Sequence, residues 1–223
     1  MAKKRISDVL IDVLANAGIE RIYGITGDSL NSVNDSLRRN GKIAFEHVRH
    51  EETAAFAAGA EASITHKLTV CAGSSGPGNL HLINGLFDCH RNRVPVLAIA
   101  SHIPQSEVGL NYFQETHPEN LFKECSCFCE LVSNPKQMPE ILFRAMNAAI
   151  GNQDVAVIVL PGDVAVMEME IDELPVWHHP RLPHIVPQRD DIEEMAAHLE
   201  TGKRITLFCG AGCEGAHDEV VEL

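Results

Sequence analysis

Short apolar segments alternate with amphipathic ones along most of this chain, and the alternation restricts the fold more than any other feature. The apolar segments, which we predict to be strands, are 21–25, 43–47, 68–72, 94–100, 127–132 and 155–160. Helical periodicity fills the intervals at 6–17, 29–39, 51–64, 79–89 and 135–150. Strands separated by helices of this length form a parallel sheet covered on both faces. The sequence therefore predicts an α/β fold with about six parallel strands.

The pattern changes after residue 165, which we take as the end of the first domain, 1–165. Residues 166–188 are rich in proline and have no clean periodicity, as expected for an extended linker. A helix, a strand at 205–209 and a glycine-containing turn follow. We therefore predict that 189–223 is the start of a second α/β domain, left incomplete at Leu223.

Composition excludes several classes of protein. Hydrophobic residues make up 45% of the chain and charged residues 22%, which is ordinary for a globular protein. The formal net charge of −13 argues against nucleic acid as a partner. No segment approaches the roughly 20 apolar residues of a membrane span, and the N-terminus lacks the apolar core of a secretory signal. We expect a cytoplasmic protein.

Seven cysteines raise the question of a metal site. Cys125, Cys127 and Cys129 alternate, so on a strand their thiols would face one side. A structural zinc site usually has a second ligand pair at matching spacing, which is missing here. We expect reduced, buried thiols rather than zinc ligands.

Glu51 and Glu52 open the predicted helix at 51–64, whose other residues are mostly small. Acidic residues favour helix N-termini because of the helix dipole, which by itself explains the pair. The small side chains also suit close packing against another backbone or a flat ligand. The adjacent pattern His47-x-x-His50-Glu51 matches neither zincin arrangement of histidine and glutamate, so we predict no metal site there.

A glycine-rich turn at 74–78 and an irregular segment at 112–115 each follow a predicted strand. Ligands of parallel α/β proteins bind at the carboxyl ends of the strands, so both segments are candidates. Pro77 fixes the first turn and removes a donor, which suits a rigid wall better than a phosphate-binding loop. His81 lies one turn further on, where a packed core histidine is an equally good interpretation.

Together these segments resemble one family. Its order and spacing are matched by Gly24–Leu30, Arg49–Glu52, Ser75–Leu86, Asp88 and Phe113–Glu115. The stretch from about residue 6 to 165 resembles the pyrimidine-binding domain of thiamine-diphosphate-dependent enzymes. Within that family, His81 and Asn84–Asp88 look like pyruvate oxidases, including quinone-linked pyruvate dehydrogenases. Acetolactate synthases more often have asparagine at the position of His81.

The resemblance implies a role for each matched residue. Glu51 matches the glutamate that hydrogen-bonds the pyrimidine ring nitrogen of thiamine diphosphate and so promotes its imino tautomer, whereas Glu52 is a rival on geometry alone. Thr26, Gly27 and Pro77 match positions that line the pyrimidine pocket, although many relatives have proline where Thr26 stands.

Other matched residues face the substrate. His81, Phe113 and Gln114 match residues beside pyruvate or a related 2-oxo acid, where hydrogen bonds from polar groups would stabilise charge after CO2 leaves. Gly210 and Gly212 weakly resemble the start of the family's FAD domain. These are catalytic and cofactor-binding expectations, and none of them is a metal ligand.

The resemblance also implies parts that the sequence lacks. The family holds Mg²⁺ and the diphosphate with a Gly-Asp-Gly segment and a later asparagine, and Gly162-Asp163-Val164 does not replace it. We therefore expect an N-terminal fragment that is inactive alone. The complete enzyme would be a homodimer or homotetramer using oxygen or quinone as electron acceptor, in the latter case peripheral to the membrane.

Two alternatives stay open at this point. The chain could be part of an acetolactate synthase or a 2-oxo-acid decarboxylase, which acetolactate or acetaldehyde as product would reveal. It could also be a non-catalytic binding or regulatory module that keeps the fold. Tight binding of another ligand or protein, measured by calorimetry, would favour that interpretation.

Overall fold

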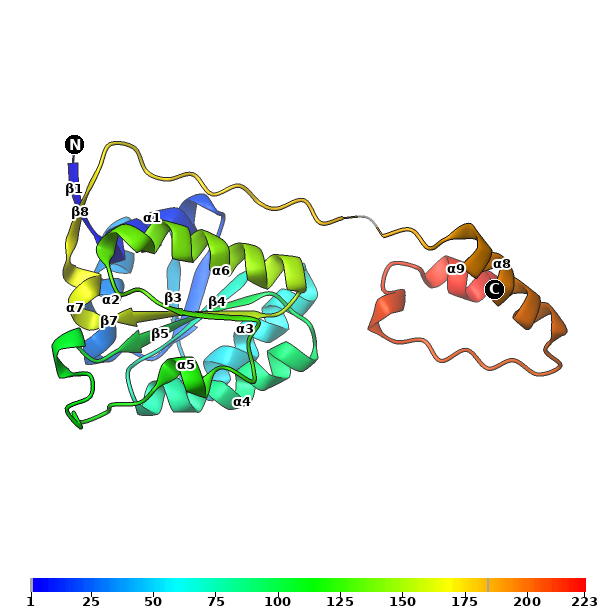
Figure 1. The fold of residues 1–223 in the computed structure, drawn as a ribbon, viewed down its shortest axis with the longest axis horizontal. Coiled ribbons are helices and arrows are strands. Elements are labelled where there is room, and N and C mark those ends of the chain that lie inside the picture. The colour runs from blue at the N-terminus through cyan, green and yellow to red at the C-terminus, as the bar shows by residue number, and fades with distance from the viewer. Residues whose placement is uncertain (1, 184) are drawn as a thin grey trace. The chain divides into compact units, whose positions relative to one another are not determined.

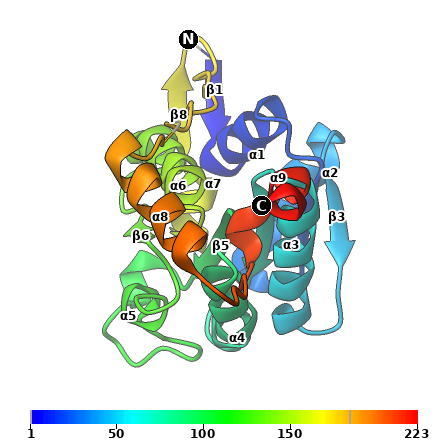
Figure 2. The same ribbon diagram turned by 90° about the vertical axis from the view of Figure 1, so that its right-hand side faces the viewer.

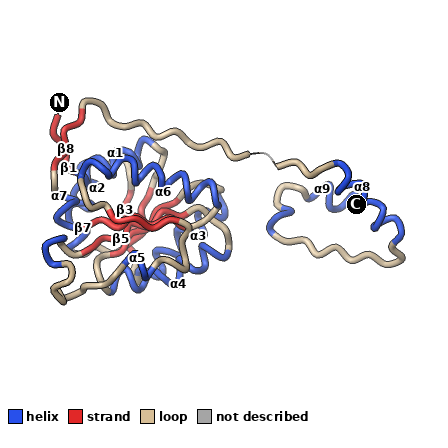
Figure 3. The backbone as a smooth tube through the Cα atoms, viewed as in Figure 1, coloured by secondary structure: helices blue, strands red, loops and turns tan. Residues whose placement is uncertain are grey.

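The computed structural model describes residues 2–183 and 185–223, which form two compact units. The first unit reaches to Arg181 and the second is Leu182–Leu223. The first unit has three layers, with a central sheet between two layers of helices (Figure 1). Figure 3 shows these strands in red between the blue helices.

The central sheet has the strand order β3-β2-β4-β5-β7-β6. Its strands are β2 (Arg21–Gly24), β3 (Ala44–His47), β4 (Thr69–Gly73), β5 (Val96–His102), β6 (Phe128–Leu131) and β7 (Val155–Pro161). Every neighbouring pair is parallel, which confirms the predicted α/β fold. All seven residues of β5 and of β7 are buried, as their continuous apolar sequences predict for central strands.

Helices cover both faces of this sheet (Figures 1 and 2). One layer contains α1 (Ile6–Asn16), α2 (Asn31–Asn40), α6 (Met138–Asn152) and α7 (Gly162–Val166), and the other contains α3 (Glu51–Thr65), α4 (Pro77–Arg91) and α5 (Pro118–Leu121). Alternate residues of β5 face the two layers, with Leu97 and Ile99 toward the first and Ala98 and Ala100 toward the second.

Helices α3 and α4 pack unusually closely, because the contact is made of small residues. A Cβ atom added to Gly85 of α4 would lie 2.6 Å from Ala55 Cβ and 2.8 Å from the Glu52 carbonyl oxygen of α3. Only glycine fits at that distance without moving a backbone. The small side chains of the helix predicted at 51–64 thus serve mainly to pack it against another helix.

A two-stranded antiparallel ribbon, which the sequence analysis did not anticipate, joins the beginning of the first unit to its end. Strand β1 (Ala2–Arg5) pairs with β8 (Glu168–Ile171), placing Lys3 opposite Glu170 and Arg5 opposite Glu168. Opposite charges across a strand pair are favourable. Further along, the Trp177 indole nitrogen donates to Asn147 Oδ1 at 3.0 Å. The first part of the predicted linker 166–188 therefore packs on the first unit.

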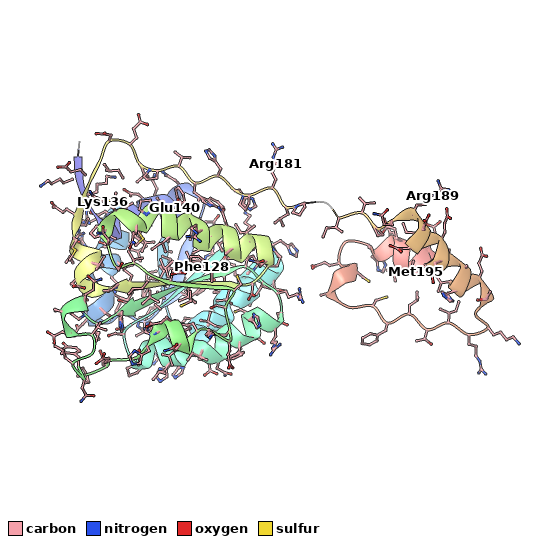
Figure 4. The ribbon with its side chains drawn as sticks, viewed as in Figure 1. Phe128, Lys136, Glu140, Arg181, Arg189 and Met195 are labelled. Carbon is pink, nitrogen blue, oxygen red and sulfur yellow. The ribbon has the colours of Figure 1, made fainter. Side chains whose placement is uncertain are left out.

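The second unit contains α8 (Arg189–Thr201), a short 3-10 turn (Ala211–Cys213) and α9 (His217–Glu222). Figure 4 labels Arg189 and Met195 on α8. The predicted strand at 205–209 is wrong, since that segment is drawn as loop in Figure 3 and Phe208 is fully exposed. A strand needs a neighbour to satisfy its backbone groups, and this segment has no ladder partner among the described residues. No described helix is long and apolar enough to cross a membrane.

An ionic network ties α1 to α2 on the first layer. The Arg5 guanidinium donates to Asp35 Oδ2 at 2.7 Å and contacts Asp8 Oδ1 at 3.3 Å, and Arg39 also binds both carboxylates. Partial burial opposes ionisation of Asp8, but hydrogen bonds from Ser36, Arg5 and Arg39 outweigh it and lower its pKa. Hydrogen bonds from Arg5 and the neighbouring arginines lower the pKa of Asp35.

This network predicts acid sensitivity. Because both folded-state pKa values lie below the unfolded-state value of about 3.9, the stabilisation is complete above that pH and is lost as the pH falls below it. Urea unfolding measured from pH 6 to pH 2.5 should show this loss. The double variant Asp8→Asn/Asp35→Asn should be less stable at pH 6 and should lose less stability on acidification. Parallel curves for the two proteins would contradict the assignment.

Candidate functional site

The turn at 73–78, which runs from the last residue of β4 to the first two residues of α4, is the centre of the candidate site. Gly76 has a left-handed φ of 68°, and a Cβ there would lie 2.7 Å from Gln114 Cβ. A Cβ on Gly78 would lie 3.2 Å from Glu51 Oε1, and one on Gly27 would overlap Ser74. The glycines therefore let three separate segments meet at this turn.

A serine bridge holds the turn in place. Ser75 N donates to Ser29 Oγ at 2.9 Å, and the hydroxyls of Ser29 and Ser74 lie 3.0 Å apart. Ser75 Oγ donates to Gln114 Oε1 at 3.2 Å. Gln114 itself has a φ of 70°, an uncommon conformation for a residue with a side chain. Sequence reasoning missed Ser29, because serine before a helix is also typical of an ordinary N-cap.

Glu51 and His81 come from the two closely packed helices and form a hydrogen bond. Glu51 is the first residue of α3 and is only 8% exposed, and its Oε2 lies 2.9 Å from His81 Nδ1. Glu52 differs in both respects, since it is half-buried and binds the Asn84 side chain. The structure thus gives Glu51, and not Glu52, the position facing His81.

His50 completes this group. Its ring stacks on that of His81, with centroids 4.3 Å apart and planes at 25°. His50 is also the N-cap of α3, where its Nδ1 accepts from Glu52 N at 3.3 Å. The sequence suggested no partnership with His81, because the two residues lie on different helices.

The remaining predicted site residues occupy different places. Thr26 and Pro77 are exposed, Pro77 being the first residue of α4. Phe113 is 77% exposed and, with Gln114, lines a cavity of about 250 Å³. The other lining residues are Asp28, Ser29, Asn31, Ser32, Ser75, His102, Ile103, Pro104, Tyr112, Gly162 and Val166. Glu51, Pro77 and His81 do not line this cavity.

Gly210 and Gly212 belong to the second unit, whose predicted strand is missing. A Cβ added to either residue would meet no atom within 4 Å, so no described part of this unit packs against them. The residues present do not form the strand–turn–helix that a flavin site of the predicted kind requires. The FAD prediction therefore gains no support from this segment.

The three clustered cysteines are not arranged as the alternation suggested. Strand β6 begins at Phe128, after Cys125 and Cys127 (Figure 4 labels Phe128). Cys125 is buried and Cys127 exposed. Desolvation raises the pKa of Cys125 to about 11 and that of Cys129 to about 12, which keeps these thiols protonated at neutral pH.

The family described as "Thiamine pyrophosphate enzyme, N-terminal TPP binding domain" matches residues 4–121, which contain every part of the site around the 73–78 turn. The chain belongs to this family. Its sheet, flanking helices and buried Glu51 are consistent with that membership, which supports thiamine diphosphate as cofactor.

Similar proteins do not distinguish the reactions catalysed within this family. The chain is 57% identical over its whole length to an uncharacterized 42.6 kDa protein of the isoamylase 3′ region in Pseudomonas amyloderamosa, 57% of which is covered. Over 96% of its length it is 31% identical to pyruvate oxidase of Lactiplantibacillus plantarum, covering 36% of that enzyme. It is 32% identical over its whole length to acetolactate synthase of Arthrospira platensis, covering 40% of it. The chain thus spans roughly two fifths to three fifths of these relatives.

The residues around Glu51 fit the pyrimidine half of the cofactor. A buried carboxyl group needs a partner that can share a proton, and a pyrimidine ring nitrogen is such a partner. Gly78 brings the backbone at the start of α4 close to that carboxyl, since a Cβ there would lie 3.2 Å from Glu51 Oε1. Among the described residues, we assign none to Mg²⁺ or to the diphosphate.

Proposed function

We propose that this chain forms the pyrimidine-binding side of a thiamine diphosphate site in an enzyme that decarboxylates a 2-oxo acid, with pyruvate as substrate. The observation that carries the proposal is the buried Glu51 carboxyl group at the start of α3, beside the glycine turn and 2.9 Å from His81. Bound thiamine diphosphate would supply the carbon nucleophile that attacks the 2-oxo group.

In this proposal, the chain's own residues position a proton. Glu51 would share a proton with the ring nitrogen. His81 Nδ1 orients the Glu51 carboxyl group through the bond already present. Gln114, fixed by Ser75, would donate from its amide toward the substrate. Phe113 is exposed and would cover the substrate from the same loop.

Oxidation of pyruvate to acetate is the finer part of the proposal. It rests on His81, the Asn84–Asp88 segment and Phe113–Gln114, which match pyruvate oxidases, and on the pyruvate oxidase relative. This reaction would need Mg²⁺, FAD and oxygen or a quinone, and it would take place in a homodimer or homotetramer. We assign no residue of this chain to FAD.

Acetolactate synthesis is the second candidate, because similarity to the acetolactate synthase relative is as high as to the oxidase. Both reactions begin with decarboxylation of pyruvate. In the first the remaining two-carbon unit is oxidised to acetate, and in the second it is added to another 2-oxo acid without oxidation. The proposed role of Glu51 is the same in either case.

Two measurements, made on a full-length enzyme that includes this chain because we expect the chain alone to be inactive, test the proposal. Calorimetric titration with thiamine diphosphate should show binding that weakens about tenfold or more in Glu51→Gln, since hydrogen bonds to charged groups contribute about 1.5–3 kcal/mol. Incubation with [2-¹³C]pyruvate, thiamine diphosphate, Mg²⁺ and an electron acceptor, followed by NMR, should give acetate. Acetolactate would shift the assignment to the second candidate. Absence of cofactor binding, or tight binding of an unrelated ligand instead, would contradict the proposal.

A further inference from the structure

His50, Glu51 and His81 offer one ligand atom each, and these atoms all lie within 4.8 Å of one another. The Glu51 side chain is 11% exposed, whereas those of His50 and His81 are 47% and 44% exposed. The group therefore has a buried carboxylate at its base and an open side toward solvent. Two histidines and one carboxylate, with one position left open, are a donor set typical of catalytic zinc sites.

We propose that these three residues bind a divalent transition-metal ion, with Zn²⁺ as the preferred ion and water as its fourth ligand. Imidazole nitrogen and carboxylate oxygen both suit Zn²⁺, and the set contains too few oxygen ligands for Mg²⁺ or Ca²⁺. Binding at this site requires only the three side chains and is independent of the proposed enzymatic function.

The distances allow such a site after small side-chain movements. Zinc–ligand bonds of about 2.1 Å place tetrahedral ligand atoms about 3.4 Å apart. The Glu51 Oε2 to His81 Nδ1 distance is now 2.9 Å, and the other separations are at most 4.8 Å. The two rings are now stacked with their planes at 25°, so each half-exposed ring has to rotate out of the stack until its nitrogen points toward the ion.

Glu52 is placed to support the site. Its Oε2 lies 3.7 Å from His50 Nδ1. If His50 binds the metal through Nε2, its Nδ1 carries a proton that the Glu52 carboxylate can accept. Metal-bound histidines commonly donate to a carboxylate in this way. With a proton on Nδ1, His50 would lose the long hydrogen bond that Nδ1 now accepts from Glu52 N.

The site shares Glu51 with the proposed pyrimidine contact. A metal ion bound to that carboxyl group would block its hydrogen bond to the ring nitrogen, so Zn²⁺ and thiamine diphosphate should exclude each other. Only this consequence rests on the proposed function.

The test uses Co²⁺ as a spectroscopic probe and Zn²⁺ in competition with a chelating dye, on the whole chain without thiamine. We expect one tight site per chain, with the visible absorption of tetrahedral cobalt and no thiolate-to-cobalt band. The variants His50→Ala/His81→Ala and Glu51→Gln should each weaken binding by about 100-fold or more. Glu51→Gln keeps the side-chain volume and serves if the double variant does not fold, which circular dichroism would show.

His47→Ala is the matched control. His47 is an exposed histidine at the end of β3 and lies near His50 in sequence, but it is outside the cluster. Its replacement should leave the tight site unchanged. A tight site that survives the loss of Glu51, a thiolate band, or the absence of tight Co²⁺ and Zn²⁺ binding by the unmodified chain would overturn the proposal.

Discussion

Glu51→Gln should lower the kcat of thiamine-diphosphate-dependent pyruvate turnover by about 10²- to 10⁴-fold, the range typical of losing a positioned acid or base. Glutamine keeps the size of the buried side chain and can still contact His81, so the fold should be retained. It cannot share a proton with the ring nitrogen, which is the role that we propose for Glu51. The measurement is release of labelled CO2 from [1-¹⁴C]pyruvate at saturating cofactor, in a preparation where the unmodified protein is active.

Glu52→Gln is the control, because it makes the same chemical change one residue away. Glu52 is half-buried and contacts Asn84 rather than His81, so kcat should change little. Exchange of the thiazolium C2 proton with D2O, followed by NMR, isolates the step concerned and should slow only in Glu51→Gln. An equal loss of kcat in the two variants would show that the reaction depends on negative charge at the helix terminus and not on the Glu51 carboxyl group.

Gly85→Ala should lower the free energy of unfolding by about 1–3 kcal/mol, the usual cost of forcing an extra carbon into a packed interior. The new Cβ would meet the Glu52 carbonyl oxygen at 2.8 Å and the Phe56 nitrogen at 3.0 Å, and neither backbone atom can turn aside. Helices α3 and α4 would have to separate. Because they carry Glu51 and His81, the 2.9 Å hydrogen bond should lengthen as well.

Gly151→Ala provides the comparison within a helix of equal length. Gly151 is exposed near the end of α6, and a Cβ there would meet no atom within 4 Å. Alanine is the better helix former, so this variant should be more stable by up to about 1 kcal/mol. Urea unfolding of both proteins measures the difference. Stabilisation by Gly85→Ala as well as by Gly151→Ala would mean that the α3–α4 contact is looser than described.

The main sheet could be predicted from the sequence because its signals are local. Continuous apolar segments such as 94–100 and 155–160, separated by periodic helices, leave few alternatives to a parallel sheet. The β1–β8 ribbon could not be predicted from the sequence, because its strands are short, charged and separated in sequence by most of the first unit. The segment 205–209 was predicted wrongly for the opposite reason: its apolar pattern is that of a strand, but none of the strands that the structure describes lies beside it.

The candidate site was predictable in part for similar reasons. Its turn carries glycines whose spacing is visible in the sequence, and the helix starting at Glu51 has an unusual composition. The contacts between segments were not visible. His81 meets Glu51 because α3 and α4 pack on the same face, and Ser29 meets Ser75 because their strands are neighbours in the sheet. Such contacts follow from topology rather than from any local pattern.

The strand order has a consequence for synthesis of the protein on the ribosome. Strand β7 lies between β5 and β6 but is made after both, so the mostly apolar β5 has no partner on that edge until residues 155–161 emerge. Exposed apolar strand edges promote aggregation of nascent chains. Ribosome-bound chains that end shortly before β7 are therefore expected to depend most on chaperones. In chains that extend beyond β7, pairing of β7 with β5 should protect this edge from aggregation.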